Sequence, residues 1–413
     1  MPVQTNAMLL LAGLESLLNV DPILTVADAI PTSKFLPGYK FDELQRLVVN
    51  KSIDAAKKLI GRETIDFNYE VELLASGVVG TEPTWGRLLE ACGFTKEVLA
   101  AAAISDPIAG YGNTGLSGLA VAKGGSFTGT EPRVYKVEVT TAGASGAAMV
   151  SVTCRGDSSQ NSADNTVTTA TPINLGDEGA TITLTFASGS LVLGDKWYVH
   201  CYPPGIRYRP TAYNGTWKTA FFYLYLGGLL FKGGGARGNF SLSAPAGEIA
   251  KLNFTFQSVF NSISDAAVPD YTEDSRVPAI VELAGLHVDD DNTLVAKTIG
   301  IETGNTIVAR QNVNAAQGLD SFRISARDNQ FSIDPEAKLE AEFDFWHKMR
   351  EREEVPVSFK IGSGAGNIVH TFIRRAVIDN LGPTDDEDLL RYGITGQCRP
   401  SPAGNDNIEI FVC

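Results

Sequence analysis

Segments in which apolar and polar residues alternate recur along most of the 413-residue chain, and this period of two constrains its fold most strongly. Such alternation places successive side chains on opposite faces of a β-strand, so that one face is buried and the other contacts water. Residues 64–75 (TIDFNYEVELLA) show it clearly, with one apolar face made by Ile65, Phe67, Tyr69, Val71 and Leu73. The pattern predicts a mainly β fold, and the length allows two or three domains.

Two stretches instead have the three- and four-residue spacing of a short helix. In the first, Pro83 suits the start of a helix and Gly93 its end, and one face holds Trp85, Leu88, Leu89 and Cys92. In the second, residues 334–353, we expect Asp334 to cap the helix and Pro335 to occupy its first position. Its apolar stripe is Leu339, Phe343, Trp346 and Met349. Trp85 and Trp346 are therefore predicted core anchors.

Composition and turn positions divide the chain into an arm and three folded parts. The first fifty residues show no sustained period and are expected to lie on their own domain or on a neighbour. Between residues 124 and 204 the chain is rich in Thr, Ser, Gly and Val, which predicts an inserted β-sandwich with Trp197 in its core. The expected domains are an arm (1–50), a first unit in two pieces (51–123 and 205–268), the insert (124–204) and a second unit (269–413).

The first and second units show the same order of predicted elements. Each has an alternating strand, a short helix with a tryptophan, a pair of strands joined across glycines, and a last strand. In the first unit, the insert follows the helix. The shared order favours an internal duplication of one β-rich unit, based on element order and not on residue identity.

Three stretches outside the insert resemble the major tail tube proteins of long-tailed, siphovirus-type bacteriophages. Residues 61–94 (GRETIDFNYEVELLASGVVGTEPTWGRLLEACGF) look like the family's first strand and helix. Residues 235–258 (GARGNFSLSAPAGEIAKLNFTFQS) look like its paired strands, and residues 344–372 (DFWHKMREREEVPVSFKIGSGAGNIVHTF) like its last helix and strand pair. The insert resembles the immunoglobulin-like modules that decorate phage tails.

The resemblance implies two tandem tube units, each a β-sandwich or partial barrel with a flanking helix. In this family, copies join sheet edge to sheet edge into rings, and rings stack into a hollow tube through which double-stranded DNA passes. Two units per chain imply homotrimeric rings with pseudo-sixfold symmetry, whereas one unit implies homohexamers. Other tail proteins would bind the tube ends. The implied location is the virion tail, assembled in the cytoplasm of the bacterial host.

The chain is acidic, with 34 Lys and Arg residues against 48 Asp and Glu residues and a formal net charge of -14. Binding to nucleic acid requires cationic side chains that displace counterions, so this chain is expected to let duplex DNA slide without sticking. Candidates for lumen or stacking-face charge are two acidic runs: Asp289, Asp290 and Asp291, and Asp385, Asp386, Glu387 and Asp388. An outer position is the alternative for each run.

No motif for catalysis, a cofactor or a metal is recognised. His200, His287, His347 and His370 are the only histidines, and none has metal-ligand spacing to another His or to Cys. The glycine-rich segments 233–238 and 362–367 lack the Lys-Ser/Thr of a phosphate-binding loop. The five cysteines are expected to be reduced, although Cys154 and Cys201 could face each other in the insert. We therefore expect a structural protein and not an enzyme.

The N-terminal stretch lacks the basic residues of a signal peptide, and the apolar run 220–230 is shorter than a membrane span. We expect a cytoplasmic product with no membrane partner. Two other functions remain open. One is the inner tube of a sheathed contractile tail or related injection system. The other is a cell-surface adhesin or carbohydrate-binding protein, which the insert suggests but which should carry a signal peptide.

Overall fold

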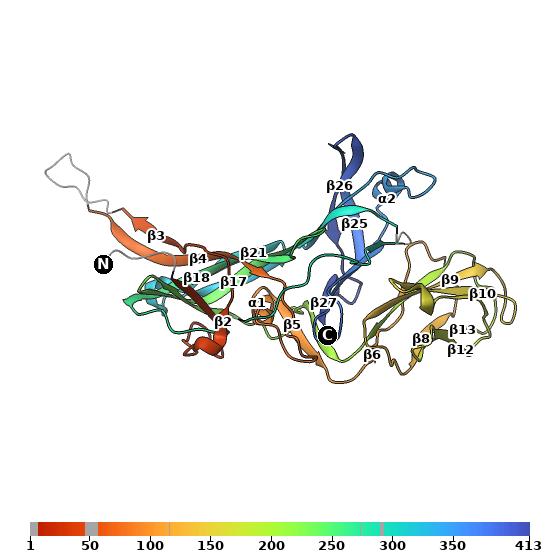
Figure 1. Cartoon of the computed structure of the whole chain (residues 1–413), viewed down its shortest axis with the longest axis horizontal. Coiled ribbons are helices and arrows are strands. Elements are labelled where there is room, and N and C mark those ends of the chain that lie inside the picture. Colours follow the sequence, from red (N-terminus) through yellow and green to blue (C-terminus); the bar gives the residue numbers. More distant parts are fainter. Residues whose placement is uncertain (1–6, 46–56, 115, 273, 290–292) are drawn as a thin grey trace.

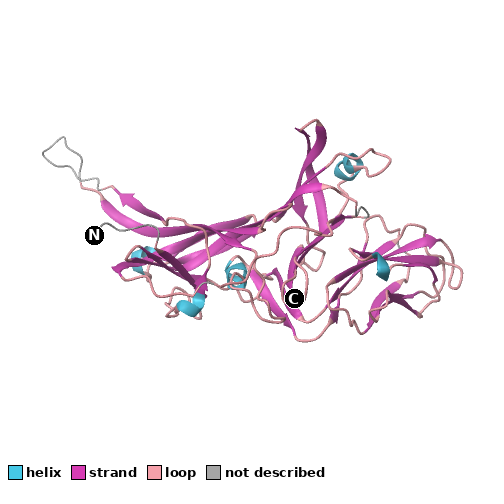
Figure 2. Ribbon diagram, viewed as in Figure 1, coloured by secondary structure: helices cyan, strands magenta, loops and turns pink. Residues whose placement is uncertain are grey.

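The structure is a computed structural model that describes residues 7–45, 57–114, 116–272, 274–289 and 293–413. It is mainly β, and within these residues the only α-helices are α1 (Gly86–Ala91) and α2 (Phe345–Arg350). Figure 2 shows an elongated molecule whose strands continue from one end to the other. The fold class predicted from the alternating pattern is therefore confirmed.

The first unit is built from β1 (Met8–Leu14), β3 (Gly38–Leu44), β4 (Leu59–Glu72), α1, β16 (Ala220–Leu226), β17 (Leu229–Pro245) and β18 (Lys251–Asp265). Strand β4 contains residues 64–72 of the predicted strand 64–75, and all five of the predicted apolar side chains, including Leu73 just beyond it, are buried. Trp85 is also buried and donates a hydrogen bond from Nε1 to the carbonyl of Leu74, 2.8 Å away. Gly93 follows α1 with a φ of 87°, a conformation that suits glycine at a helix end.

The second unit contains β19 (His287–Val288), β20 (Ala296–Glu302), β23 (Gln330–Pro335), α2, β24 (Val355–Ile361), β25 (Val369–Asp386), β26 (Leu389–Cys398) and β27 (Ile408–Val412). Between β20 and β23 the chain makes a separate hairpin of β21 (Asn305–Gln311) and β22 (Leu319–Arg327). Residues 321–327 (SFRISAR), which alternate between apolar and polar, lie in β22, and the expected strand pair and last strand of this unit are present after residue 355.

The two units share one pattern of antiparallel pairing. In the first, β1 pairs with β16, β16 with β17, β17 with β18, β18 with β4, and β4 with β3. In the second, β19 pairs with β24, β24 with β25, β25 with β26, β26 with β23, and β23 with β20. Helix α1 follows β4, and helix α2 follows β23. The same topology therefore occurs twice along the chain.

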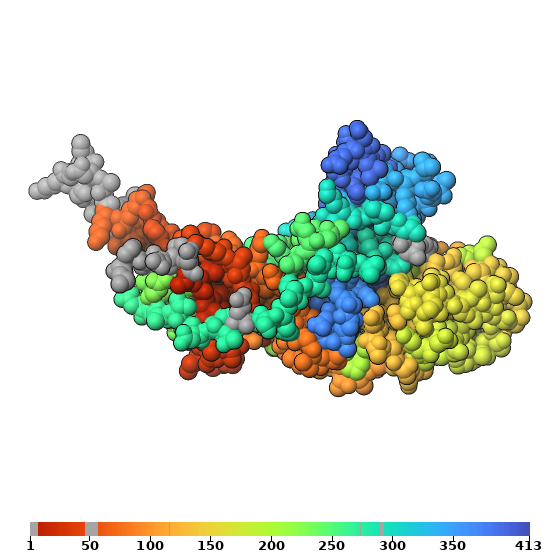
Figure 3. All heavy atoms as spheres, in the orientation of Figure 1, coloured from red at the N-terminus to blue at the C-terminus, as the bar shows by residue number. Residues whose placement is uncertain are grey.

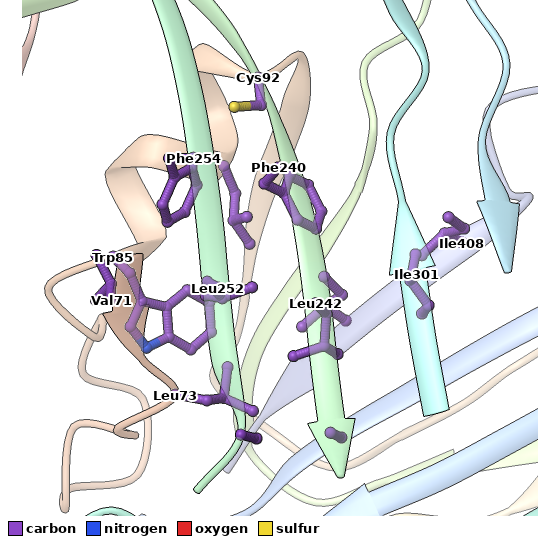
Figure 4. Close-up of a cluster of buried hydrophobic side chains, with 14 of the residues drawn as sticks. Val71, Leu73, Trp85, Cys92, Phe240, Leu242, Leu252, Phe254, Ile301 and Ile408 are labelled. Carbon is purple, nitrogen blue, oxygen red and sulfur yellow. The ribbon is translucent and has the colours of Figure 1, made fainter. Parts of the chain in front are cut away.

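The two units form one sheet and one core. Strand β17 pairs with β20, and β15 (Gly205–Pro210) pairs with β27, so the 16-stranded sheet is continuous. Figure 4 shows Trp85 beside Leu252 of β18, and Ile301 and Ile408 of the second unit belong to the same buried cluster. Separate unfolding of the two units would expose apolar surface on both, so we expect them to fold cooperatively.

The insert is a two-sheet sandwich, and it begins earlier than residue 124. One sheet contains β6 (Ala103–Ile104), β7 (Ile108–Ala109), β9 (Arg133–Thr141), β10 (Met149–Arg155), β11 (Ser162–Thr166) and β14 (Lys196–Tyr202). The other contains β8 (Ala120–Gly125), β12 (Pro172–Leu175) and β13 (Ala180–Thr185). Trp197 is buried in its core, as predicted. Leu99, at the end of β5 (Phe94–Leu99), pairs with Gly205, so the insert occupies residues 100–204.

The N-terminal segment is not an arm throughout. All seven residues of β1 pair with β16, and β2 (Ala29–Ile30) pairs with β1. Both faces of β1 are covered, because Leu10 and Ala12 lie in the main core while Leu9 and Leu11 lie in a second cluster. A strand buried on both faces needs no alternation, which explains why residues 8–12 show none.

The second predicted helix begins later than expected. Residues 330–335 form β23, and Asp334 Oδ1 accepts hydrogen bonds from the backbone N–H groups of Lys297 and Thr298 at a bulge in β20. Helix α2 is capped by Asp344, whose side chain accepts from the N–H of His347. The later start changes which side faces inward: Phe345 is 1% exposed and Trp346 39%. Trp346 is therefore not the core anchor of the second unit.

Candidate assembly interface

The join between the two units is made by strand addition. Residues Ser241–Pro245 of β17 pair with Thr298–Glu302 of β20, on the edge of β17 that lies opposite β18. The backbone groups of one unit's edge thus bond to those of the other. An unpaired edge is a template for a further strand, and this edge is filled within the chain.

The β21–β22 hairpin of the second unit lies over the first unit. Leu319 and Phe322 of β22 contact Val259 of β18, and they are 1% and 7% exposed. Partly buried side chains from β21, Ile307 and Ala309, complete the cluster. The hairpin therefore covers the outer face of β18 with apolar side chains.

Two asparagines, one from each unit, hydrogen-bond to each other and favour one register for the contact between the units. Asn305 N–H donates to Asn239 Oδ1 at 2.7 Å, and Asn239 Nδ2 donates to the carbonyl of Asn305 at 3.1 Å. Asn305 Nδ2 also donates to the carbonyls of Cys92 and Gly238 at 2.9 and 3.0 Å. Buried amides that find several partners favour one alignment over its slipped alternatives. Nothing in the local sequence predicted this pair, because its two members lie in different units.

The counterparts of these joined elements are open at the two ends of the chain. Strand β25 continues beyond its pairing with β24, which ends at Ala376, and only β26 follows it to Asp386. Within the described residues, no strand pairs with the other edge of residues 380–386. Strand β3, at the far end of the sheet, likewise pairs only with β4 among the described strands. These edges correspond by topology to the β17 and β20 edges that meet inside the chain.

The first unit's hairpin, made of β3 and the start of β4, carries large apolar side chains that the described residues leave about half exposed, although Tyr39 packs edge-on against Phe260. Five large apolar residues there are between 45% and 63% exposed: Tyr39, Phe41, Leu44, Leu59 and Ile60. Figure 3 shows this hairpin (orange) extending from one end of the molecule, with the insert as a lobe at the other. Clustered exposed apolar residues mark interaction surfaces more often than single ones do.

Asp289 is not a surface charge. It lies between the insert and the second unit, with its carboxylate 2.6 Å from Lys348 Nζ and 3.1 Å from Lys196 Nζ and from Tyr198 Oη. Burial opposes ionisation, but the two ammonium groups outweigh it and lower the pKa of Asp289 to about 2. Asp289 thus pairs its charge within the chain and is unsuited to lining a channel. Asp290 and Asp291 lie outside the described residues.

The other acidic run forms the tip of the β25–β26 hairpin. Glu387 and Asp388 have φ values of 56° and 69°, as in a two-residue turn of type I′. Asp386 is paired with Arg391 Nε at 2.8 Å and with Lys297 Nζ at 3.2 Å. Asp385, Glu387 and Asp388 are exposed. This tip therefore presents negative charge to solvent, next to the open edge of β25.

A buried polar junction joins β15 of the first unit, and the adjoining strand β14 of the insert, to the second unit. Glu409 accepts from Arg209 Nε at 2.6 Å, and Arg374 Nη2 lies 3.7 Å from the same oxygen. Burial lowers the pKa of His370 to about 4 and that of His200 well below its usual range, so both rings are neutral at pH 7. The ring of His200 also contacts Phe372. The ion pair of Arg209 with Glu409 thus joins the first unit to the second, and the contact of His200 with Phe372 joins the insert to the second unit.

The described residues contain no group of three or more His, Cys, Asp and Glu side chains placed to hold a metal ion. All five cysteines are free and buried, so Cys154 and Cys201 are separate thiols in the insert. His347 lies on the surface, 3.6 Å from Glu353. No described helix is long and apolar enough to cross a membrane. Comparisons with protein-family models and with curated proteins find no match.

Proposed function

We propose that this protein is the subunit of a tail tube, in which copies join edge to edge into rings that stack into a hollow conduit for phage DNA. One observation carries the proposal: the chain repeats one topology and joins the repeats by strand addition, and no described strand pairs with the corresponding outer edges of the two repeats. A head-to-tail contact of this kind generates either a closed ring or an open filament. The resemblance of three stretches to tail tube proteins favours the ring.

The charge of the chain supports a DNA conduit. Duplex DNA carries about one negative charge per 1.7 Å of its axis, and a basic channel would retain it. A chain with a formal net charge of -14 supplies a repulsive surface instead. Strand pairing between neighbours would offset the resulting repulsion among subunits.

Ring stoichiometry tests the proposal. If each chain supplies two of six equivalent positions, three chains close the ring. We expect purified protein, concentrated stepwise, to form annular particles by electron microscopy, with a native mass of three chains or a multiple of three through stacking. Rings of six chains would contradict the use of both units in the wall. Chains that stay monomeric at every concentration would contradict the proposed function itself.

A further inference from the structure

One face of the second unit's sheet is exposed and has features of a surface that binds another protein segment. Six residues of β23, β25 and β26 share this face, because they lie opposite one another or alternate along one strand. We call them the uncharged face: Gln330, Ser332, Asn380, Gly382, Gly393 and Thr395. All six are at least partly exposed and uncharged, and charged residues on the same side of the sheet, Glu302, Asp334 and Arg391, border them. Sheet faces meant for water commonly carry charged residues, so this one is suited to being covered.

Neither backbone conformation nor close packing among the described residues requires glycine at two positions of the uncharged face. Gly382 and Gly393 lie directly opposite each other, and neither has a positive φ. A Cβ added at either would meet only the carbonyl oxygen of the other, at 3.9 and 3.6 Å. Glycine inside a strand weakens it, and its presence often marks the close approach of another backbone or ligand. The pair therefore points to a neighbour that contacts the bare backbone.

The structure already shows what covers the corresponding face of the first unit. There, the β21–β22 hairpin lies across β18 and buries Leu319 and Phe322 against Val259. By topology, β3 and β4 correspond to β20 and β23, and β26 corresponds to β18. The β21–β22 hairpin continues β20 and β23 after breaks of two residues, so the outer part of the β3–β4 hairpin corresponds to it. The β3–β4 hairpin exposes Tyr39, Phe41 and Leu44. Within the described residues, the side chains of Phe41 and Leu44 are about half exposed, whereas Leu319 and Phe322 of the β21–β22 hairpin are buried.

We propose that the β3–β4 hairpin of one copy lies on the uncharged face of the next copy, with its apolar side chains against Gly382 and Gly393. The chain leading into β3 then adds to the open edge of β25 at residues 380–386, as β20 adds to β17 within the chain. This contact rests on the proposed ring function and identifies the surfaces that form the seam between chains.

Two variants isolate the two halves of the contact. Gly393→Trp places a bulky side chain on the uncharged face, where the chain itself leaves open space, and Thr395→Trp is a second variant of the same face. Phe41→Asp places a charge on the hairpin. Thr185→Trp, on an exposed strand position of the insert, is the matched control. Each variant is first compared with the wild type by thermal unfolding, which we expect to be unchanged within a few degrees.

The proposal predicts a specific result on mixing. Gly393→Trp alone and Phe41→Asp alone should each remain at the mass of one chain, under conditions in which the wild type and Thr185→Trp assemble. Mixed together, the intact hairpin of Gly393→Trp can dock on the intact face of Phe41→Asp, but the reverse contact is blocked. The mixture should therefore give a one-to-one complex, at twice the mass of a chain, and no rings.

The alternatives have distinct outcomes. Assembly of both variants to the same extent as the wild type would overturn the hairpin contact while leaving ring formation intact. Monomeric variants that form no complex on mixing would show that the two surfaces do not meet, which also overturns it. A wild-type chain that never assembles would overturn this contact together with the proposed function.

Discussion

Single residues in this protein are best understood from their partners in other parts of the chain. Asp289 and Trp346 both have a local sequence context that suggests a different role. Asp289 belongs to an acidic run, yet its neighbours in space are two lysines, one from the insert and one from α2. Trp346 is large and apolar, as expected of a buried core residue, yet Phe345 is buried in the core and Trp346 is partly exposed.

Substitutions of the two neighbouring aromatic residues of α2, Phe345 and Trp346, should differ in their effect on stability. Phe345 is buried in the main core against Phe343 and Tyr392, so Phe345→Ala should lower the free energy of unfolding by about 3–5 kcal/mol. Trp346 is 39% exposed, and its Nε1 lies 3.3 Å from Tyr392 Oη. Trp346→Ala should cost about 1 kcal/mol. Urea denaturation of both variants measures the difference. Equal losses would place Trp346 in the core after all.

The Asp289 cluster predicts an acid-sensitive term in stability. A carboxyl whose pKa is lower in the folded state than its usual value of 3.8 stabilises the fold above that value. This stabilisation is lost as the pH falls from about 3.8 to about 2. Between pH 5 and pH 3, the wild type should lose about 1 kcal/mol more than Asp289→Asn.

The same substitution should already be destabilising at pH 7. Removing the carboxylate leaves Lys196 without this buried partner and weakens the pairing of Lys348, which costs about 3–5 kcal/mol when such a pair is broken. Urea denaturation across this pH range measures both effects, with Asp177→Asn on an exposed turn of the insert as the control. Parallel pH profiles for Asp289→Asn and the wild type would contradict the ion-pair assignment.

Elements with one exposed face were predictable, and elements with unusual surroundings were not. Strand β4 is recognisable because one face lies on the core and the other in solvent. Strand β1 carries no such signature because both of its faces are buried. Asp334 and Pro335 have the chemistry of a helix start, but Asp334 instead satisfies two backbone donors at a bulge. Tertiary pairing of β23 with β20 and β26 outweighs that local preference.

The boundaries of the insert predict which deletion folds. Leu99 and Gly205 are paired neighbours, so removing residues 100–204 and joining β5 to β15 through Asn-Gly preserves the sheet. This variant should fold and assemble, because the proposed seam lies in β3, β25 and β26. It should also be less stable, since Phe411 and Ile368 lose the cover of Tyr202.

A deletion at the boundary predicted from composition provides the comparison. Removing residues 126–202 leaves β6, β7 and β8 without β14 and β13, their partners in the sandwich. We expect insoluble protein from this variant and soluble, ring-forming protein from the 100–204 deletion, as measured by size-exclusion chromatography and electron microscopy. Loss of assembly in a folded 100–204 deletion would place the insert in the ring contact.

At the scale of the whole molecule, the repeat determines the function that we propose. One repeat alone would leave both of its edges open. With two repeats in one chain, one of the two edge-to-edge contacts forms within the chain, and one contact per chain remains for assembly. A ring would then need half as many separate chains as a ring of single-repeat chains. The insert lies at the opposite end of the molecule from the β3–β4 hairpin (Figure 1), so it can vary without altering that hairpin.

The sequence by itself determined the β class, most strands, the first helix with Trp85, and the order of elements that repeats. These features depend on contacts between near neighbours or on one buried face, and both leave a periodic pattern. Only the tertiary structure decided the place of β1, the start of α2, the boundary of the insert, and the pairing of Asp289 with Lys196 and Lys348. The tertiary structure also decided the hydrogen bonds between Asn239 and Asn305 and the opposed, exposed position of Gly382 and Gly393. Each depends on residues far apart in the chain, and a pattern that extends over a few residues carries no information about such partners.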